Sequence, residues 1–142
     1  MNKIEKALLV ANVAHFGQID KNGDDYINHP IRVSNLVESE TEKIVAILHD
    51  VIEDTNLNYE FIETEFDSEI ADAVFALTRQ PKENYFEFVK RAARNRISKR
   101  VKFADIADNL NPDRLNMLDE KKTKKRLIEK YTKAKELLCQ PN

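Results

Sequence analysis

Two histidines and several acidic residues stand in three short segments of this sequence. His29 comes just before a proline, His49 and Asp50 are adjacent, and Asp105 lies far downstream. Imidazole and carboxylate groups are mixed ligands that a divalent ion such as Mn²⁺ accepts, with positions left open for water. Two histidines and two aspartates would also leave the ion acidic enough to lower the pKa of water. The residue types therefore point to a metal-dependent hydrolase.

Two further acids, Glu53 and Asp54, follow His49 and Asp50 in the same segment. In a helix over residues 41–54, at about 100° per residue, these four side chains share one arc and the apolar side chains form the opposite stripe. A solvated helix face would normally include Lys or Arg, and none stands between His49 and Asp54. The pattern favours a metal site, with a solvated face as the open alternative. Acids outside the ligand set could orient water or accept its proton.

The composition predicts a single soluble domain. The chain has 142 residues, enough for a buried core, and we expect residues 1–142 to form one domain. The single cysteine, Cys139, excludes a disulfide framework or a thiolate metal cluster and favours a reducing compartment. The sequence shows neither a long apolar run nor a secretory signal, so we expect a cytoplasmic protein without membrane contact.

Charge and glycine content argue against several kinds of partner. The formal net charge is −2, which makes no broad electrostatic case for nucleic acid. The basic run at residues 121–126 is interpreted as a solvated helix face. With only Gly17 and Gly23, the chain cannot build a glycine-rich phosphate loop or a dinucleotide fingerprint. We therefore expect no nucleic acid partner, and the sequence sets no oligomeric state.

The hydrophobic pattern is helical throughout, with little two-residue alternation, so the predicted fold class is all-α. The segment from Gly17 to Asn28 is rich in turn formers and interrupts the pattern. Ser39 followed by Glu42 is typical of a capping box. The predicted helices cover residues 2–16, a stretch from 30, residues 41–54, 59–65, 67–77, a stretch from 85, and residues 98–110 and 119–138.

Five segments between residues 14 and 110 carry a family resemblance. They are Ala14–Gln18, Tyr26–Val33, Leu48–Thr55, Ala76–Thr78 and Lys102–Leu110, in this order. The chain resembles the HD-domain phosphohydrolases. Within that superfamily it is most similar to the hydrolase domain of the Rel/SpoT alarmone enzymes and to small alarmone hydrolases of the Mesh1 type. The resemblance implies a single HD-domain helical bundle.

The resemblance also implies an activity, a cofactor and a small-molecule nucleotide substrate. The implied reaction removes the 3′-pyrophosphate from guanosine tetra- or pentaphosphate (ppGpp or pppGpp), releasing GDP or GTP and pyrophosphate. Glu53 and Asp54 match the acids that activate or position the attacking water. Lys21 and Asn22 match the loop along the base and phosphates, and Asn109 matches a residue that contacts the nucleotide. The matches to the metal ligands, usually of one Mn²⁺ ion, are His29, His49, Asp50 and Asp105.

The chain departs from this family in the substrate loop. Asp20 stands where the bifunctional enzymes usually carry an arginine, and Asp25 stands where a proline usually precedes the tyrosine. An arginine there can stack on guanine and pair with phosphate, whereas an aspartate does neither. Residues 85–115 resemble a short bacterial subfamily whose substrates are less defined. A related adenosine nucleotide is therefore an alternative substrate.

Three further side chains have both a functional and a structural interpretation. Tyr85 could stack on a base, but with Phe86 and Phe88 at this spacing it is more often part of a core. Arg79, on a predicted loop, could bind phosphate or only serve solubility. His15 lies on the apolar stripe of the first predicted helix and is interpreted as a packed core histidine.

Two other functions stay open at this point. One is another HD nucleotide phosphohydrolase, such as a nucleotidase. The other is a non-catalytic nucleotide-binding protein, for instance an antitoxin-like partner of an alarmone synthetase. Glu53 and Asp54 argue against the second, because a protein that only binds a nucleotide has no need of them.

Overall fold

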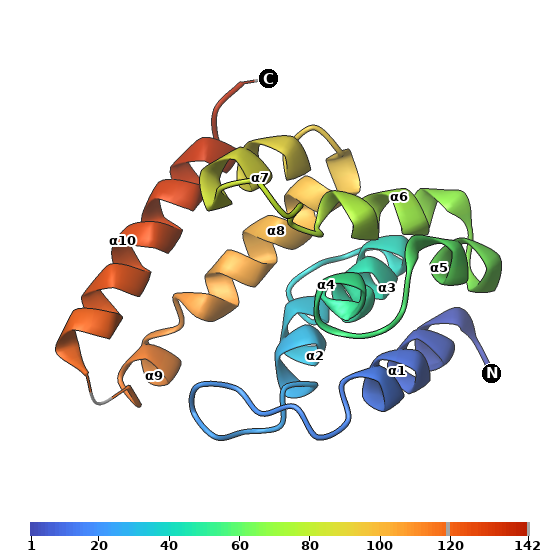
Figure 1. The fold of residues 1–142 in the computed structure, drawn as a ribbon, viewed down its shortest axis with the longest axis horizontal. Helices are drawn as coiled ribbons and strands as arrows, with labels where there is room; N and C mark the ends of the chain where they lie inside the picture. The colour runs from blue at the N-terminus through green and yellow to red at the C-terminus, as the bar shows by residue number, and fades with distance from the viewer. Residues whose placement is uncertain (119, 142) are drawn as a thin grey trace.

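Helices make up the regular structure of this chain (Figure 1). The computed structural model describes residues 1–118 and 120–141. Within these ranges no strand forms, and Ile19 and Asp25 make an isolated antiparallel bridge in the loop after the first helix. The all-α prediction is confirmed. The helices are α1 (Lys3–Ala14), α2 (Asn28–Ser34), α3 (Glu40–Leu48), α4 (Val51–Asp54), α5 (Tyr59–Glu65), α6 (Ser68–Ala76), α7 (Tyr85–Ala92), α8 (Arg96–Asn109), α9 (Pro112–Leu115) and α10 (Lys121–Leu138).

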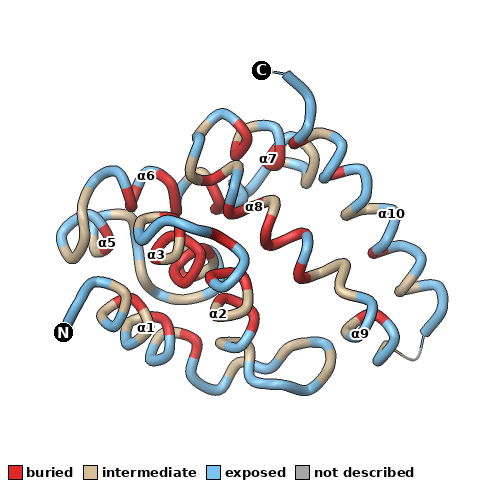
Figure 2. The backbone as a smooth tube through the Cα atoms, turned by 180° about the vertical axis from the view of Figure 1, so that it is seen from behind, coloured by how far each residue is buried: buried red, intermediate tan, exposed pale blue. Residues whose placement is uncertain are grey.

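Helix α3 lies at the centre of the fold. Residues 44–48 of α3 are buried, and α1, α2, α6 and α8 pack around this helix. Figure 2 shows the buried stretches running through α3 and the middle of α8. Ala7 and Ala11 on α1, and Ala71 and Ala73 on α6, have no exposed surface. Small residues at these positions let the outer helices approach the core closely, and the apolar area they bury stabilises the fold.

A second apolar cluster forms where α10 packs on α7 and α8. Ala134 and Leu138 of α10 join Val89 of α7 and Ile106 of α8 there, and Tyr85 packs against both clusters. Most of the basic run on α10 is exposed, as expected for a solvated face. Among the described residues, no helix combines the length and the apolar character needed to cross a membrane. The expectation that the whole chain forms one domain stays a prediction.

Side-chain caps set where most helices begin. At α3, Ser39 Oγ accepts from the Glu42 backbone N–H at 3.1 Å, and Glu42 Oε1 accepts from the Ser39 N–H at 3.1 Å. This confirms the predicted capping box. Each cap satisfies a backbone amide that the start of a helix would leave without a partner. The other residues whose side chains accept from a first-turn amide are Asn2, Asn58, Asp67, Asn84, Asn95 and Asn111.

The prediction of one continuous helix over residues 41–54 is wrong. Helix α3 ends just before His49, and α4 begins just after Asp50, so these two residues form a turn. His49 Nδ1 donates to the Ala46 carbonyl at 2.6 Å, and the Tyr26 hydroxyl donates to the Asp50 carboxylate. These contacts hold the turn and outweigh the local helical pattern. The acids therefore do not meet by sharing one arc of a continuous helix.

Other boundaries also differ from the sequence prediction. Helix α9 was not predicted; Asn111 caps it, and Pro112 occupies its first position, where the fixed φ of proline suits a helix. Helix α8 begins at Arg96 because Asn95, not a later residue, supplies its cap. The predicted start of the last helix, Asp119, lies outside the described residues, and α10 begins at Lys121.

The capping box at α3 yields a stability prediction. Ser39→Ala should lower the free energy of unfolding by about 1 kcal/mol, because it removes the acceptor for the Glu42 amide. Denaturant unfolding followed by circular dichroism measures the change. Ser68→Ala is the matched control, because Ser68 is exposed and the cap of its helix comes from Asp67. Equal losses in the two variants would contradict the role of the cap.

Candidate functional site

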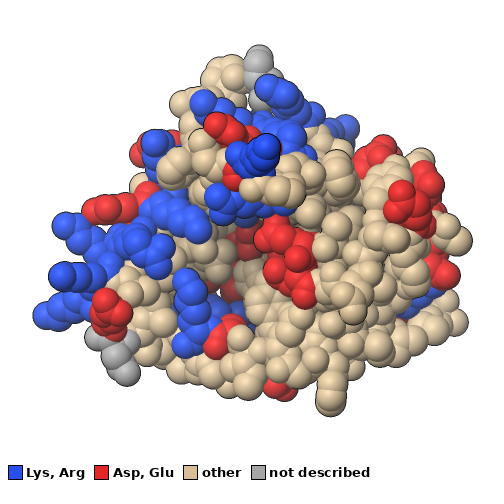
Figure 3. Space-filling view, viewed as in Figure 1, with Lys and Arg blue, Asp and Glu red and all other residues tan. Residues whose placement is uncertain are grey.

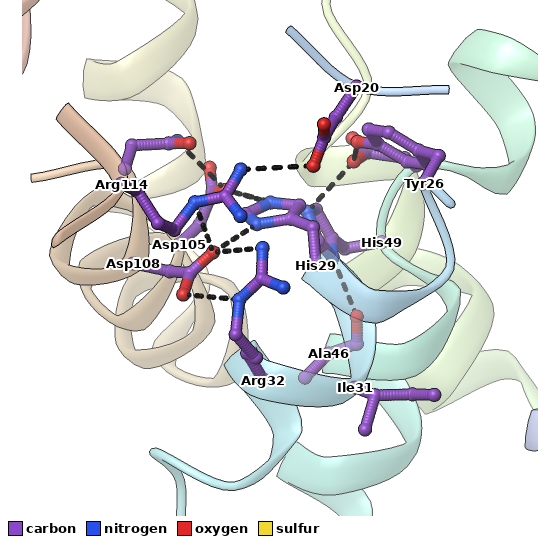
Figure 4. A network of polar contacts seen from close by, with 12 residues as sticks. Asp20, Tyr26, His29, Ile31, Arg32, Ala46, His49, Asp105, Asp108 and Arg114 are labelled. Carbon is purple, nitrogen blue, oxygen red and sulfur yellow. Dashed lines mark hydrogen bonds and ion pairs between the residues drawn. The ribbon is translucent and has the colours of Figure 1, made fainter. Parts of the chain in front are cut away.

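Three side chains from separate parts of the sequence meet at the centre of the site (Figure 4). His29 comes from the start of α2, His49 from the turn after α3, and Asp105 from α8. One potential ligand atom from each of the three side chains lies within 4.8 Å of the other two. His29 Nε2 is 2.8 Å from Asp105 Oδ1, and His49 Nε2 is 3.6 Å from the same oxygen. The described residues thus include a His/Asp set that could hold a metal ion.

His49 is oriented as a metal ligand would be. Its Nδ1 donates to the Ala46 carbonyl at 2.6 Å, which leaves Nε2 to face the site. This Nε2 is buried and makes no hydrogen bond, although Asp50 Oδ2 lies 3.0 Å away. A buried polar atom without a partner is costly, and a cation bound there would satisfy it. An imidazole nitrogen beside two carboxylates is a donor set that fits a divalent ion.

Asp108 and Arg32 hold the other histidine in place. His29 Nδ1 is 2.6 Å from Asp108 Oδ2. Arg32 donates to both Asp108 oxygens, from Nε at 2.9 Å and from Nη2 at 3.2 Å. A carboxylate bonded to the far nitrogen of a histidine fixes the ring and makes the near nitrogen a better ligand. The sequence alone assigned Asp108 no role. The spacing could have indicated one, because Asp108 stands three residues after Asp105 and so lies on the same side of α8.

Lys102 is a further residue that sequence reasoning missed. Its Nζ lies 2.9 Å from Asp105 Oδ2, and each of the two side chains is only 8% exposed. The ammonium group also lies over the rings of Tyr85 and Phe88, at 5.2 and 4.9 Å from their centroids. Burial would raise the pKa of Asp105, but Lys102 and His29 outweigh it and hold that pKa well below its usual range. The carboxylate therefore stays ionised.

The electrostatics of the site favour positive charge between the histidines and the acids. Burial lowers the pKa of His29, but its hydrogen bonds to Asp105 and Asp108 outweigh this and raise the pKa. At His49 burial is likewise outweighed by Asp50 and Asp105, and the pKa rises well above its ordinary value. A divalent cation would meet the same demand for positive charge.

A second acidic group borders the first. Asp50, Glu53 and Asp54 have carboxylate oxygens within 4.8 Å of one another. The Tyr26 hydroxyl donates to Asp50, and Glu53 Oε1 accepts from the backbone N–H of Arg79 at 2.7 Å. Partial burial, together with the charges of Asp50 and Glu53, raises the pKa of Asp54 to about 6. Asp50 links the two groups, because it also lies beside His49.

The acids and part of the His/Asp set open into one pocket of about 390 Å³. Figure 3 shows a hollow in this face of the molecule, with acidic atoms along one side and basic atoms along another. Lys21, Asn22 and Asn109, which the sequence assigned to substrate binding, all line the pocket. Asn109 Nδ2 also donates to Asp105 Oδ1 at 3.3 Å, and Asn22 Oδ1 is buried without a hydrogen-bond partner. The fold thus gathers these residues, and their roles stay predictions.

Among the described residues, the lining of this pocket does not include Arg79 or Tyr85. Tyr85 packs with both apolar clusters, edge-on against neighbouring aromatic rings. Arg79 is exposed, and its Nε donates to the Glu83 carbonyl at 2.9 Å. These contacts agree with the structural interpretation of both residues. His15 is 2% exposed and bonds Gln18 through Nδ1 at 2.8 Å, as expected of a packed histidine.

Comparison with known proteins relates this site to alarmone enzymes. No family model matches the chain. A guanosine-3′,5′-bis(diphosphate) 3′-pyrophosphohydrolase of Borreliella burgdorferi is 42% identical over 80 residues, which cover 54% of this chain and 12% of that protein. The bifunctional (p)ppGpp synthase/hydrolase SpoT of Escherichia coli K12 is 36% identical over 87 residues, which cover 58% of this chain and 12% of that protein. The match therefore spans a small part of these relatives.

A solved structure matches the chain over its whole length. It is that of a metazoan ortholog of SpoT that hydrolyses ppGpp and plays a role in starvation responses. The TM-score is 0.85 at 25% sequence identity, over 100% of this chain and 88% of that chain. The chain folds as a Rel/SpoT hydrolase-like HD domain. The resemblance inferred from the five segments is confirmed, and the closer likeness to a short bacterial subfamily stays a prediction.

The geometry of this HD domain predicts stabilisation by a divalent cation. At a hundredfold excess over its Kd, the cation should add about 2.7 kcal/mol to the free energy of unfolding. His49→Ala and Asp50→Asn should lose most of the resulting rise in Tm, because each removes a predicted ligand. Substitution of Asp105 is less informative, since it would leave Lys102 buried without its partner.

The control for this experiment is Asp72→Asn, which changes an exposed acid on α6. It should keep the full rise in Tm on addition of the cation. An equal rise in the wild type and in all three variants would contradict the metal site.

Proposed function

We propose that this chain hydrolyses the 3′-pyrophosphate group of guanosine tetra- or pentaphosphate, or of a related adenosine nucleotide. The products would be GDP, GTP or their adenosine counterparts, together with pyrophosphate. One observation carries the proposal: part of a His/Asp set that could hold a metal ion lines one pocket together with two further acids, Glu53 and Asp54. The full-length similarity to a SpoT ortholog that hydrolyses ppGpp supports it.

The proposal covers hydrolysis and not synthesis. Some relatives have names that describe synthesis, such as a probable GTP pyrophosphokinase of Mycobacterium leprae, which is 34% identical over 80 residues. This chain matches 10% of that protein. The solved structure that matches the whole chain is described by ppGpp hydrolysis, and the proposal therefore takes hydrolysis alone.

We propose Mn²⁺ as the resident ion, since a mixed set of imidazole and carboxylate ligands suits it. The chemistry that such an ion supplies when bound is activation of water and stabilisation of charge on phosphoryl oxygens. The chain holds both histidine rings through hydrogen bonds to Asp108 and to the Ala46 carbonyl. The residues that would hold the ion are His29, His49, Asp50 and Asp105.

Glu53 and Asp54 are the proposed catalytic acids. The Arg79 amide fixes Glu53 Oε1, and Glu53 Oε2 has no partner among the described residues. Gln18 donates to the Asp54 carbonyl at 2.9 Å and so holds the end of α4. Both carboxylates are exposed to solvent at the pocket. A positioned carboxylate in contact with water can orient that water towards phosphorus and accept its proton.

The proposed substrate-binding residues sit around the same opening. Lys21 offers a positive charge for a phosphate, and Asn22 and Asn109 offer amide groups. Arg79 and Tyr85 are secondary candidates, because neither lines the pocket. We also propose a cytoplasmic location, in keeping with a lone, exposed cysteine.

Removal of the catalytic acids should separate binding from chemistry. Glu53→Gln and Asp54→Asn keep the size of the side chain but lose the proton acceptor, so turnover should fall about a hundredfold or more. Pyrophosphate release from guanosine 3′,5′-bis(diphosphate) with Mn²⁺ measures turnover, and metal analysis should show that the ion is retained. Glu63→Gln, at an exposed acid on α5, is the control and should keep full activity. Near-wild-type turnover in both site variants would mean that these acids are only surface charges.

Substrate choice should depend on the 3′-pyrophosphate more than on the base. With Asp20 in place of the usual arginine, the loop offers guanine no stacking side chain at that position. The guanosine and adenosine 3′,5′-bis(diphosphates) should therefore be cleaved at comparable rates with Mn²⁺. A lost base contact removes about ten- to a hundredfold of discrimination. Turnover assays with product identification by chromatography make the comparison.

Three results would point elsewhere. A guanosine preference well beyond a hundredfold would mean that another residue reads the base. Release of single phosphate groups from simple nucleotides, without cleavage of either bis(diphosphate), would favour a nucleotidase. Tight nucleotide binding without any turnover would favour the non-catalytic, antitoxin-like partner.

A further inference from the structure

Arg114, on α9, lines the pocket without a part in the proposed chemistry. Its Nη2 lies 3.2 Å from Asp20 Oδ2, and its Nε lies 3.9 Å from Asp108 Oδ2. Figure 4 shows the guanidinium group between these two carboxylates. The arginine side chain is 19% exposed, so it is largely enclosed but reachable from the pocket. It connects the substrate loop to α8.

Asp20 is itself held firmly by its own loop. Its Oδ1 accepts from the backbone N–H groups of Asn22 at 2.8 Å and Asp24 at 3.0 Å. Burial raises the pKa of Asp20, but the loop hydrogen bonds and Arg114 outweigh it and lower that pKa. Asp20 therefore presents a fixed negative charge to Arg114.

This environment makes Arg114 a poor phosphate site and a good stacking surface. Asp20 offsets the charge of Arg114 and would repel a phosphate placed beside it. Nη2 and Nε face the carboxylates of Asp20 and Asp108, and Nη1 has no partner among the described residues. Arg114 lines the pocket with 19% of its side chain exposed, and the flat face of a guanidinium group stacks well on aromatic rings.

The surroundings of Arg114 in the pocket are also suited to a base. Several apolar side chains from the loop and from the segments around α9 and α10 line the pocket with it. A nucleotide has a charged phosphate end and a flat aromatic end. A pocket with residues that could bind a metal ion on one side and apolar side chains on another suits both ends. The apolar lining residues are Ile19, Leu115, Leu118, Leu127 and Tyr131.

We propose that Arg114 is a substrate-binding residue that stacks on the nucleobase, with Asp20 as its positioning residue. The inference rests on the proposed nucleotide substrate. It also accounts for the departure at position 20. Where the related bifunctional enzymes carry an arginine in the loop, this chain has an aspartate that holds an arginine from α9. Because stacking accepts every base, the inference agrees with comparable rates for guanosine and adenosine substrates.

The test compares ligands with and without a base and needs no turnover. Calorimetry with Mn²⁺ present would measure the binding of GDP, ADP and inorganic pyrophosphate. Arg114→Ala should weaken GDP and ADP binding by about ten- to a hundredfold and leave pyrophosphate binding unchanged. Arg114→Lys should lose as much, because lysine keeps the charge without the flat faces. Asp20→Asn keeps a side-chain oxygen that can accept the loop hydrogen bonds but loses the charge that pairs with Arg114. It should weaken GDP binding by a smaller factor.

Arg100→Ala is the matched control, because Arg100 pairs with Glu42 at 3.3 Å away from the pocket lining and its side chain is 57% exposed. It should leave the binding of all three ligands unchanged. Equal weakening of pyrophosphate and nucleotides in Arg114→Ala would overturn stacking in favour of phosphate binding. Wild-type affinity for GDP in Arg114→Lys, or no nucleotide binding by the wild type, would also overturn it.

The same experiment separates this inference from the proposed function. A wild type that binds GDP through Arg114 but cleaves neither bis(diphosphate) would support the inference and reject the hydrolase. Turnover of both bis(diphosphates) with unchanged nucleotide binding in Arg114→Ala would support the hydrolase and reject the inference.

Discussion

The rest of the structure depends on the buried negative charge of Asp105. An ionised carboxylate in a protein interior is costly unless cations or hydrogen-bond donors surround it. Lys102 on the same helix, His29 on α2 and His49 after α3 provide these partners. Helices α2, α3 and α8 also pack directly on one another. The packing that buries the core and the contacts that assemble the site are therefore one arrangement, and a shift of any of these helices would disturb both.

Burial decreases outward from that charge. Asp105 is buried, Asp50 is partly exposed, and Glu53 and Asp54 are exposed. The short helix α4 produces this order, because it begins after the turn at His49 and carries its acids to the surface. Such an order suits hydrolysis. Groups that would hold a cation need fixed geometry, which burial and hydrogen bonds provide, whereas groups that accept a proton need contact with water.

The pocket has two sides of different origin. One side comes from α2, α4, α8 and the turn before α4, which contribute His29, Asp50, Glu53, Asp54 and Asp105. The loop after α1, with α9 and α10, contributes much of the remaining lining. Loops and peripheral helices can change their side chains without repacking a core. Asp20 and Arg114 both belong to this outer side. Under the proposed function, the loop that would contact the substrate could therefore differ between related enzymes without a change in the His/Asp set.

The sequence by itself determined the all-α class, the starts of most helices and the presence of histidines and acids of the kind that bind metal ions. Local chemistry carries this information, as the capping box at Ser39 shows, because a cap depends on neighbours a few residues away. Only the tertiary structure decided that the helix breaks at His49, that Lys102 and Asp108 support the site, and that Arg114 meets the substrate loop. These outcomes rest on contacts between elements, most of them far apart in sequence. Such contacts can override local propensity, and their energies do not appear in any local pattern.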